Sequence, residues 1–374
     1  MHLIQIYLKN YRNYLQEHLK FNRYLNIIVG KNAQGKTNLL EAIYILGTGI
    51  SHRTNVNSEL VNWDYNKFMI KGEAQINKQK FKLELSLKGR SKEAFINSNK
   101  LKKINQLMEY LNVVIFAPED LNLVKGSPSR RRDFINLEIS QISSYYRNLL
   151  KEYKKVLKQR NNLLKDIRDR RADSNNLAVW NQQLIKLGSK IIKKRLEALN
   201  KLSILAKLMQ RKITDGKETL KLKYDTKLKI GHNSNLEEIK TEFENNLDRL
   251  QQKEIERGVT VIGPHRDDIS LLVNDIDIRK FGSQGQQRTT ALALKMAELE
   301  FMKAEVGEYP ILLLDDVFSE LDKDRSKHLL KIIENKIQTF ITSTDLNEFS
   351  SIKSKAKVFK IRDGSINGKE NLNA

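Results

Sequence analysis

A phosphate-binding pattern lies near the amino terminus. The segment from Gly30 to Thr37 reads Gly-Lys-Asn-Ala-Gln-Gly-Lys-Thr and matches G-x-x-x-x-G-K-T at every position. Its glycines let the backbone curl so that several N–H groups face one phosphate. Lys36 brings a positive charge to the β- and γ-phosphates, and the Thr37 hydroxyl suits Mg²⁺. The sequence predicts a triphosphate and Mg²⁺ site at Gly30, Lys31, Asn32, Ala33, Gln34, Gly35, Lys36 and Thr37.

Two adjacent carboxylates follow an apolar run far along the chain. Residues 310–314 read Pro-Ile-Leu-Leu-Leu, and Asp315 and Asp316 come next. A buried parallel strand would deliver both acids at its carboxyl end, the edge where ligands bind in α/β sheets. Two buried acids without a cation are unfavourable. The pair therefore predicts a metal or basic partner, with Asp315 holding Mg²⁺ and Asp316 polarising the attacking water.

A third pattern begins at Ser283. It reads Ser-Gln-Gly-Gln and precedes the apolar stretch 291–297. Ser283 and Gln286, three residues apart, predict a capping box at the start of a helix. Gly285 beside this cap leaves the helix N-terminus open to a phosphate.

Strands and helices of an α/β fold must position these groups. Ile27 to Val29 predicts the strand that enters the phosphate loop, and Leu39 to Leu46 predicts the helix that leaves it, ending near Gly47 and Gly49. Short strands are expected at 4–8 and 15–21. Alternating apolar residues over 67–101, with a turn at 77–79, predict a small antiparallel sheet, and 113–116 predicts a buried strand.

Residues 129–212 predict two long helices broken at 170–176, packed antiparallel through apolar stripes. This segment holds 22 Lys or Arg and 7 Asp or Glu, a net charge of +15. Ser127 and Pro128 predict the start of the first helix. Arg130, Arg131 and Arg132 follow at its positive end, so either they fan out into water or an anion lies beside them, and we favour the anion.

The composition narrows the function. The chain has 374 residues, a formal net charge of +22 and no cysteine. Disulfides, cysteine-bound zinc and a thiol nucleophile are excluded, and a reducing cytoplasm is expected. No apolar stretch reaches membrane-spanning length and no signal peptide is evident, so no membrane association is expected. DNA or RNA is the expected polyanionic partner. Diffuse solubilising lysine is the alternative.

The region between 213 and 268 is less informative. Leu220 to Tyr224 predicts a strand and Asn235 to Glu256 a helix. His265, Asp267 and Asp268 have the residue types of a metal site. A loop that satisfies its own polar groups is the interpretation we favour.

Taken in order, these motifs resemble an ABC-type ATPase. Lys36 and Ser283 are 247 residues apart, a gap wider than in transport ATPases and filled in SMC proteins by very long coiled coils. A basic helical insert of moderate size resembles the RecF family of the SMC-like branch. Further segments that carry the resemblance are Asn10 to Tyr14, Ala117 to Leu121 with Arg130 to Arg132, Gly263 to Asp268, and Leu314 to Val317.

The resemblance implies roles for individual residues. Arg12 would lie near the phosphates, and Ser283, Gly285 and Gln286 would act in trans on a nucleotide held by a second copy. Asp316 stands where most ABC ATPases have a catalytic glutamate, and Thr344 where transporters have a histidine. Both departures imply slow turnover.

The resemblance also implies an architecture and a function. The fold would be an ABC/SMC-type ATPase head with an antiparallel subdomain, formed by 1–120 and 256–374, and an inserted helical lobe at 121–255. ATP would drive head-to-head dimerisation on double-stranded, gapped or single-stranded DNA, and hydrolysis would release it. RecO, RecR and RecA would be the partners in repair, replication restart and the SOS response. A transport ATPase subunit and a DNA-binding scaffold with a structural nucleotide are the alternatives.

Overall fold

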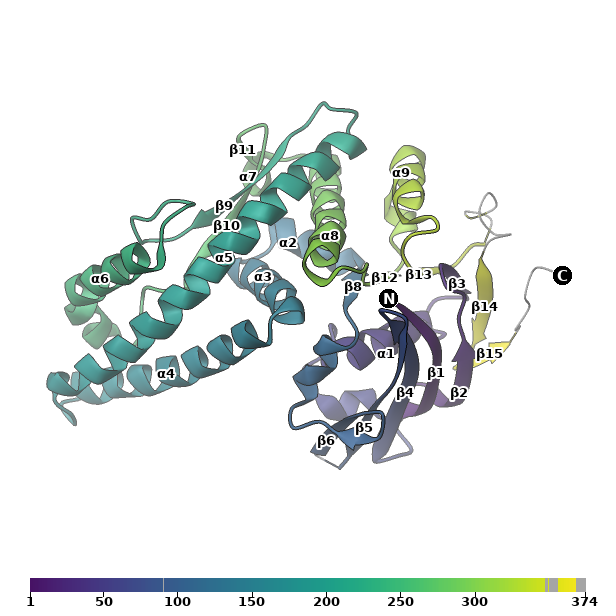
Figure 1. Cartoon of the computed structure of the whole chain (residues 1–374), viewed down its shortest axis with the longest axis horizontal. Coiled ribbons are helices and arrows are strands. Elements are labelled where there is room, and N and C mark those ends of the chain that lie inside the picture. The colour runs from purple at the N-terminus through teal and green to yellow at the C-terminus, as the bar shows by residue number, and fades with distance from the viewer. Residues whose placement is uncertain (90, 347–348, 350–355, 368–374) are drawn as a thin grey trace. The chain divides into compact units, whose positions relative to one another are not determined.

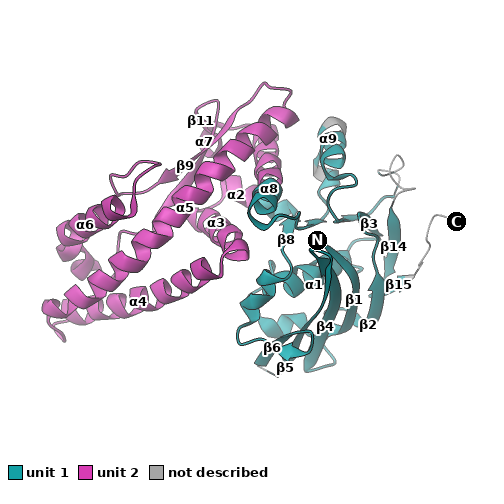
Figure 2. Cartoon of the chain, in the orientation of Figure 1, with its two compact units in different colours: residues 1–120, 298–374 teal, residues 121–297 magenta. Residues whose placement is uncertain are grey.

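The chain forms two compact units, which are described separately (Figures 1 and 2). The structure is a computed structural model that describes residues 1–89, 91–346, 349 and 356–367. Unit 1 contains residues 1–120 and 298–374, and unit 2 contains residues 121–297. Segments from both ends of the chain therefore build unit 1.

A six-stranded sheet that is mostly parallel forms one layer of unit 1. Its order is β15-β14-β3-β13-β12-β8, and only the edge strand β15 is antiparallel to its neighbour. The central β12 and β13 are buried at every residue, as continuous apolar runs require. The strands are β3 (Leu25–Val29), β8 (Val113–Phe116), β12 (Ile311–Leu314), β13 (Thr339–Ser343), β14 (Lys357–Arg362) and β15 (Ser365–Asn367).

A second six-stranded sheet in unit 1 is antiparallel and has the order β2-β1-β4-β5-β6-β7. Asn77 and Lys78 form the β4–β5 turn with φ of 47° and 66°, the left-handed values that a two-residue hairpin turn needs. The prediction for residues 67–101 is confirmed. The strands are β1 (His2–Tyr11), β2 (Tyr14–Lys20), β4 (Lys67–Ile76), β5 (Gln79–Lys88), β6 (Ser91–Ile96) and β7 (Asn99–Lys100).

The main helices of unit 1 are α1 (Lys36–Thr48) and α9 (Lys323–Ile333). Helix α1 is buried along most of its length and ends at Thr48, and Gly49, with a φ of 76°, caps its last turn. The predicted helix after the phosphate loop, with its end near Gly49, is confirmed. The same unit contains the short 3₁₀ helices η1 (Asn57–Leu60), η2 (Ile104–Glu109), η3 (Pro118–Asp120) and η5 (Phe318–Glu320).

Three helices occupy most of the segment 128–213 in unit 2, where two were predicted. They are α3 (Pro128–Ile142), α4 (Ser144–Arg168) and α5 (Leu177–Ile213), and η4 (Ser174–Asn176) precedes α5. The additional break lies at Ser143, which is extended and whose side chain accepts a hydrogen bond from the Tyr146 N–H. This cap begins a new helix, a local effect that the apolar stripe does not reveal.

Helices α4 and α5 run antiparallel, as predicted, and lie side by side in Figure 1. Arg160 Nε donates to Asn181 Oδ1 at 2.8 Å, whereas Arg195 Nε donates to the Tyr146 hydroxyl at 3.2 Å. A later residue of α5 therefore contacts an earlier residue of α4, as antiparallel packing requires.

A small antiparallel sheet completes unit 2, in the order β11-β10-β9. The predicted strand at 220–224 and the predicted helix at 235–256 are confirmed by β9 and α6. The remaining elements are α2 (Leu121–Lys125), β9 (Leu220–Asp225), α6 (Leu236–Arg257), β10 (Asp268–Val273), β11 (Ile276–Asp277), α7 (Ile278–Phe281) and α8 (Gln284–Val306), which continues into unit 1.

Residues 256–297 are grouped with unit 2 because β10 pairs with β9 and Arg131 of α3 forms an ion pair with Asp268. The division into functional segments 1–120, 121–255 and 256–374 stays a prediction. Among the described residues, no helix combines the length and apolar character needed to cross a membrane.

Candidate nucleotide-binding site

The loop between β3 and α1 has the backbone shape of a phosphate cradle. Ala33 and Gly35 have φ of 63° and 117°, so successive N–H groups turn toward one side. The φ of Gly35 lies in the left-handed region that side chains rarely adopt, and a Cβ there would also displace the Asn13 side chain, so the position favours glycine. Lys36 Nζ donates to the carbonyls of Gly30 at 2.5 Å and Lys31 at 3.0 Å. Burial lowers the pKa of Lys36, and the charges of Asp316 and Asp315 oppose that shift.

The β1–β2 turn braces this loop. Asn13 Nδ2 donates to the Gln34 carbonyl at 2.9 Å, and the Tyr14 hydroxyl donates to the Gly35 carbonyl at 2.8 Å. Asn38 of α1 donates to Asn13 Oδ1 at 2.8 Å. The bracing residues belong to the segment Asn10 to Tyr14 that carries part of the family resemblance, but their contacts could not be read from the sequence.

Arg12, predicted near the phosphates, is directed at a carboxylate of its own chain. Its Nε and Nη2 donate to Glu41 of α1 at 2.9 and 2.8 Å, and Glu41 is fully buried. The Tyr11 and Ser51 hydroxyls also donate to Glu41. Burial alone would raise the pKa of Glu41, but these hydrogen bonds and the Arg12 charge lower it below its usual value. Arg12 is outside the set of described residues that line the recess beside the loop.

A recess of about 320 Å³ lies beside the phosphate loop. It falls within the size range of small-molecule sites. It brings together the phosphate loop and the two aspartates that the sequence separates by 278 residues. The lining residues are Asn32, Ala33, Gly35, Lys36, Thr37, Asn38, Arg53, Asp315, Asp316 and Thr342.

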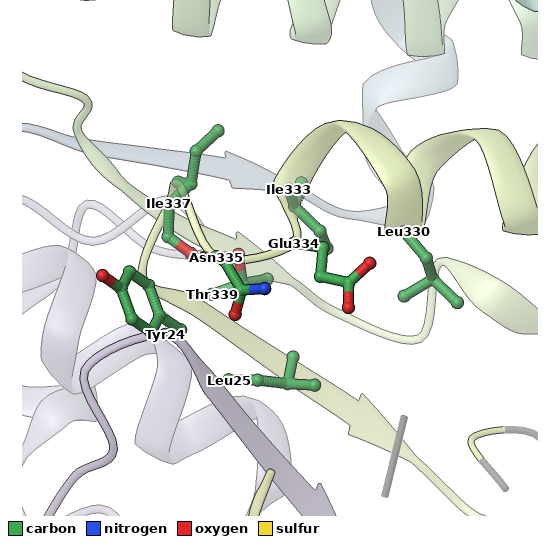
Figure 3. Close-up of a pocket in the computed structure, with 8 residues that line it drawn as sticks. All are labelled: Tyr24, Leu25, Leu330, Ile333, Glu334, Asn335, Ile337 and Thr339. Atoms are coloured by element: carbon green, nitrogen blue, oxygen red, sulfur yellow. Dashed lines mark hydrogen bonds between the residues drawn. The ribbon is translucent and has the colours of Figure 1, made fainter. Parts of the chain in front are cut away.

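Another recess in unit 1 lies between α9 and the ends of β3 and β13 (Figure 3). It holds about 30 Å³, roughly the volume of one water molecule, and its lining is mostly apolar. The described residues that line it include no lysine or arginine, so the recess beside the phosphate loop is the better candidate for a nucleotide.

Arg53 is a further candidate site residue, which the sequence analysis missed. It lines the larger recess, donates from Nη1 to Asn38 Oδ1 at 2.9 Å, and lies 3.7 Å from Glu41. Its side chain is 41% exposed, so its charge remains available to a ligand. A lone arginine in a loop after α1 has no periodicity or spacing that distinguishes it from a surface arginine.

Asp315 lies at the carboxyl end of β12 and is 7% exposed. Its Oδ1 accepts hydrogen bonds from the Thr37 hydroxyl at 3.1 Å and the Thr342 hydroxyl at 2.7 Å. Burial raises the pKa of Asp315, and both hydroxyls moderate the rise. A buried carboxylate beside a hydroxyl is an oxygen donor set that suits Mg²⁺, so these residues fit the metal that the sequence predicts.

Asp316 has a left-handed backbone, with φ of 53°, and its N–H donates to the Thr342 hydroxyl at 2.8 Å. This turn separates the two adjacent carboxylates, and both line the recess. Thr342 therefore contacts both acids, another role that the sequence analysis missed. Threonine is common in strands because its side chain is β-branched, so its presence in β13 does not indicate a functional role.

Ser283, Gly285 and Gln286 lie at the start of α8, in unit 2. Ser283 N–H donates to Gln286 Oε1 at 3.1 Å, and Gln286 N–H donates to the Ser283 hydroxyl at 3.2 Å. The predicted capping box is confirmed. Gln286 Nε2 also donates to Glu218 Oε1 at 2.9 Å.

The arginine run at the start of α3 divides into three different environments. Arg130 is exposed. Arg131 is 3% exposed and forms a two-bond ion pair with Asp268 at 2.8 and 2.9 Å. Arg132 Nη1 donates to the Asp267 carbonyl at 2.9 Å. The anion expected beside the run is, for Arg131, a carboxylate of the same chain. Helix α3 begins at Pro128 as predicted, but the Ser127 side chain makes no cap hydrogen bond.

The polar groups of the loop that contains His265 are satisfied partly within the loop and partly by side chains of α4 and β9. His265 Nε2 lies 3.2 Å from the Thr260 carbonyl and so donates to it, which leaves Nδ1 as an acceptor. His265 Nδ1 accepts from the Tyr153 hydroxyl at 2.7 Å, and the Tyr224 hydroxyl donates to Asp267 at 2.6 Å. The described residues contain no group of three or more His, Asp or Glu side chains that could hold a metal ion. Thr344 follows β13 and is exposed.

Comparisons with known proteins agree with this geometry. A family model described as the RecF/RecN/SMC N terminal domain matches residues 2–367. The solved structure of the recombination mediator protein RecF with ATP, from the RecFOR pathway, has a TM-score of 0.90 and 37% identity, over 98% of this chain and 96% of that one.

An Smc head bound to the C-terminal winged-helix domain of ScpA has a TM-score of 0.57 at 15% identity, over 98% of this chain and 96% of that one, which bears on fold alone. The predicted fold class, an α/β head of the ABC/SMC type, is therefore confirmed. The DNA replication and repair protein RecF of Halothermothrix orenii is 48% identical over 369 residues, which cover 98% of each chain. With a family match along nearly its whole length and relatives this similar, the chain belongs to the RecF family.

Proposed function

We propose that this chain binds ATP with Mg²⁺ and that bound ATP controls its affinity for DNA during replication and repair. The observation that carries the proposal is the recess in which Lys36, Thr37 and Asp315 converge, since Thr37 Oγ1 lies 3.1 Å from Asp315 Oδ1. The N–H groups from Asn32 to Gly35 would hold the phosphates. Arg53 adds a second cation beside Lys36. Bound Mg²⁺ would neutralise charge on the β- and γ-phosphates.

ATP turnover by this site should be slow. In the proposal, Asp316 accepts a proton from the attacking water, and its side chain has one methylene fewer than that of a glutamate. Its backbone is held by the hydrogen bond from its N–H to Thr342, so the shorter side chain has little freedom to make up the missing length. We expect DNA to raise the rate of ATP hydrolysis. Because hydrolysis would end the DNA-bound state, this rate would set how long the protein stays on DNA.

Two copies should enclose the nucleotides between them. At the start of α8, Ser283 is exposed and Gly285 and Gln286 are half-buried, and N–H groups at a helix N-terminus favour a phosphate. In the proposal, these residues meet the γ-phosphate held by Lys36 of the second copy. ATP would then increase the affinity for DNA by joining the two copies.

The DNA surface belongs to the basic helices of unit 2. Helix α4 exposes Lys151, Lys154, Lys155 and Lys158, which share one face because they are three or four residues apart. Together with Arg130 they offer phosphate contacts, so binding should depend on salt and only weakly on sequence. Arg131, tied to Asp268, has a structural role in this proposal.

The biological role follows from the relatives' names. The relatives named above are a DNA replication and repair protein and a recombination mediator of the RecFOR pathway. We propose that this chain acts in the cytoplasm on gapped or stalled-replication DNA, with RecO and RecR to load RecA.

Light scattering with and without ATP tests the proposal directly. The wild-type chain should double its mass only with ATP and Mg²⁺. Lys36→Ala should abolish ATP binding and dimer formation together. Ser283→Arg should bind ATP normally and stay monomeric. A wild-type chain that is equally monomeric and holds DNA equally well with and without ATP would contradict the proposed function.

A further inference from the structure

A chain of hydrogen bonds joins the basic helix α5 to the start of α8. Glu218 lies between them, in the turn that leads from α5 to β9. Its Oε1 accepts from Gln286 Nε2 at 2.9 Å, and its Oε2 accepts from Gln210 Nε2 at 2.7 Å. Gln286 in turn holds the Ser283 N–H through its Oε1. The chain therefore runs from Gln210 through Glu218 and Gln286 to Ser283.

The α5 end of this chain of hydrogen bonds is rigid. Gln210 is fully buried in the last turn of α5. The Thr214 hydroxyl donates to the Gln210 carbonyl at 2.8 Å and accepts from the Glu218 N–H at 3.1 Å. Both the side chain and the backbone of Glu218 are therefore fixed to the end of α5. A shift or rotation of that end must move the carboxylate.

The α8 end of the chain is where the capping box is set. The amide of Gln286 has two ends, one that accepts from the Ser283 N–H and one that donates to Glu218. A capping box alone needs only the first of these contacts. The second contact ties the Gln286 side chain to a group outside α8, so the position of Glu218 selects the rotamer that caps Ser283.

Helix α5 is also strongly charged. It contains nine Lys or Arg residues and one acid, Glu197. Arg195 is buried, whereas Lys207, Arg211 and Lys212 are exposed at the end that holds Glu218. DNA bound along this helix would therefore act on the element to which Glu218 is fixed. Coupling between two sites requires such a physical link, whose state both ligands influence.

We propose that Glu218 is a positioning residue that couples DNA on α5 to the Ser283–Gln286 segment. The inference rests on the proposed function, in which that segment meets the nucleotide of a second copy. Glu218 lies outside the recess that holds Lys36 and Asp315. It should therefore affect neither ATP affinity nor the rate without DNA, and should affect the response to DNA.

The experiment measures ATP turnover by the full chain with and without duplex DNA, and ATP affinity by fluorescence titration. Glu218→Ala should keep the ATP affinity and the DNA-free rate within about twofold of wild type. It should reduce DNA stimulation by about fivefold or more, the scale of an ordinary coupling. Gln210→Met, which breaks the same link from the α5 side, should reduce stimulation equally.

Two variants serve as controls. Glu218→Gln keeps the bridge if the Gln210 amide turns over, since Gln210 Oε1 is buried without a hydrogen-bond partner among the described residues. It should therefore retain DNA stimulation. Glu197→Ala removes an acid from α5 that pairs with Lys194, and it should behave as wild type.

Each outcome is decisive. A Glu218→Ala chain that DNA stimulates as strongly as wild type would overturn the inference and leave the proposed function intact. Loss of stimulation in Glu197→Ala as well would show that charge alone is responsible, which also overturns it. A wild-type chain that DNA does not stimulate would instead remove the proposed function, and the coupling with it.

Discussion

The hydroxyl of Thr342 donates a hydrogen bond to Oδ1 of Asp315 across 2.7 Å. The same hydroxyl accepts the Asp316 N–H at 2.8 Å, so one side chain on β13 orients two acids at the end of β12. In the proposed function Asp315 holds Mg²⁺, for which it must be ionised, while its burial raises its pKa. The Thr342 hydroxyl thus supports the charged form that the site needs.

Thr342→Val keeps the shape of the side chain and removes this hydroxyl. We expect about tenfold weaker binding of ATP in the presence of Mg²⁺, because the loss of a hydrogen bond to a charged group is worth about 1.5 kcal/mol. Thr342→Ser keeps the hydroxyl and should restore affinity. Titration of ATP binding with Mg²⁺ is the measurement, and equal affinity in the Val and Ser variants would refute the role.

Arg53→Ala tests the cation that the sequence analysis missed. Since Arg53 lines the recess and remains 41% exposed, its removal should weaken ATP binding by about tenfold, the effect of losing one charge-assisted hydrogen bond. The melting temperature should change little because Arg12 still neutralises Glu41. Arg23→Ala, at an exposed position of the same unit, is the control. Undiminished affinity for both ATP and ADP would place Arg53 outside the site.

The arginines at the start of α3 should differ sharply in effect. Arg131→Ala leaves Asp268 without its two-bond partner, so we expect a loss of about 2–3 kcal/mol of unfolding free energy. Arg130→Ala should leave stability unchanged and reduce the salt slope of DNA binding by about one. Urea unfolding and DNA titrations at several salt concentrations measure the two effects. A stable Arg131→Ala chain with a reduced salt slope would reverse the assignment.

A triple substitution tests the lysine face of α4. Lys151→Ala, Lys154→Ala and Lys158→Ala together should reduce the slope of log affinity against log salt by about 0.9 for each DNA phosphate that is no longer neutralised. Glu218 and the ATP site are untouched, so ATP affinity should be unchanged. An unchanged slope would move the DNA surface to another part of the chain.

Acid should weaken the fold through His265. Burial lowers its pKa to about 4 from an ordinary 6.5. A depressed pKa means that the folded state resists protonation, so the stability present above pH 6.5 is lost as pH falls toward 4. Asp267 acts in the opposite sense, because burial raises its pKa to about 6 and its contribution falls as pH rises through that value.

His265→Gln isolates this effect. The wild-type chain should be more stable than the variant at pH 7. The difference should shrink by about 1.4 kcal/mol for each pH unit below 6.5, since the variant has no imidazole to protonate. Denaturant unfolding between pH 7 and 5 measures it, with His232→Gln as the exposed control. A difference that is constant with pH would show that His265 is protonated equally in both states.

Local patterns were sufficient for much of the fold. The phosphate loop, its strand and helix, and the β4–β5 hairpin depend on residues that are near one another in sequence, such as Gly35 and Asn77. The Ser283–Gln286 capping box is equally local, because its partners are three residues apart. Such features follow from backbone sterics and period, which a single chain segment contains.

The sequence by itself determined that a triphosphate pattern, two acids after a buried strand and a strongly basic helical segment occur in one chain. Only the tertiary structure decided which groups meet. Arg53 lines the recess, whereas Arg12 donates to Glu41. Arg131 pairs with Asp268, and Glu218 links α5 to α8 through hydrogen bonds. The physical reason is that each of these side chains finds a partner across a long sequence separation or through a loop. Which partner each side chain contacts depends on packing and burial, and these produce no periodicity or motif spacing in the sequence.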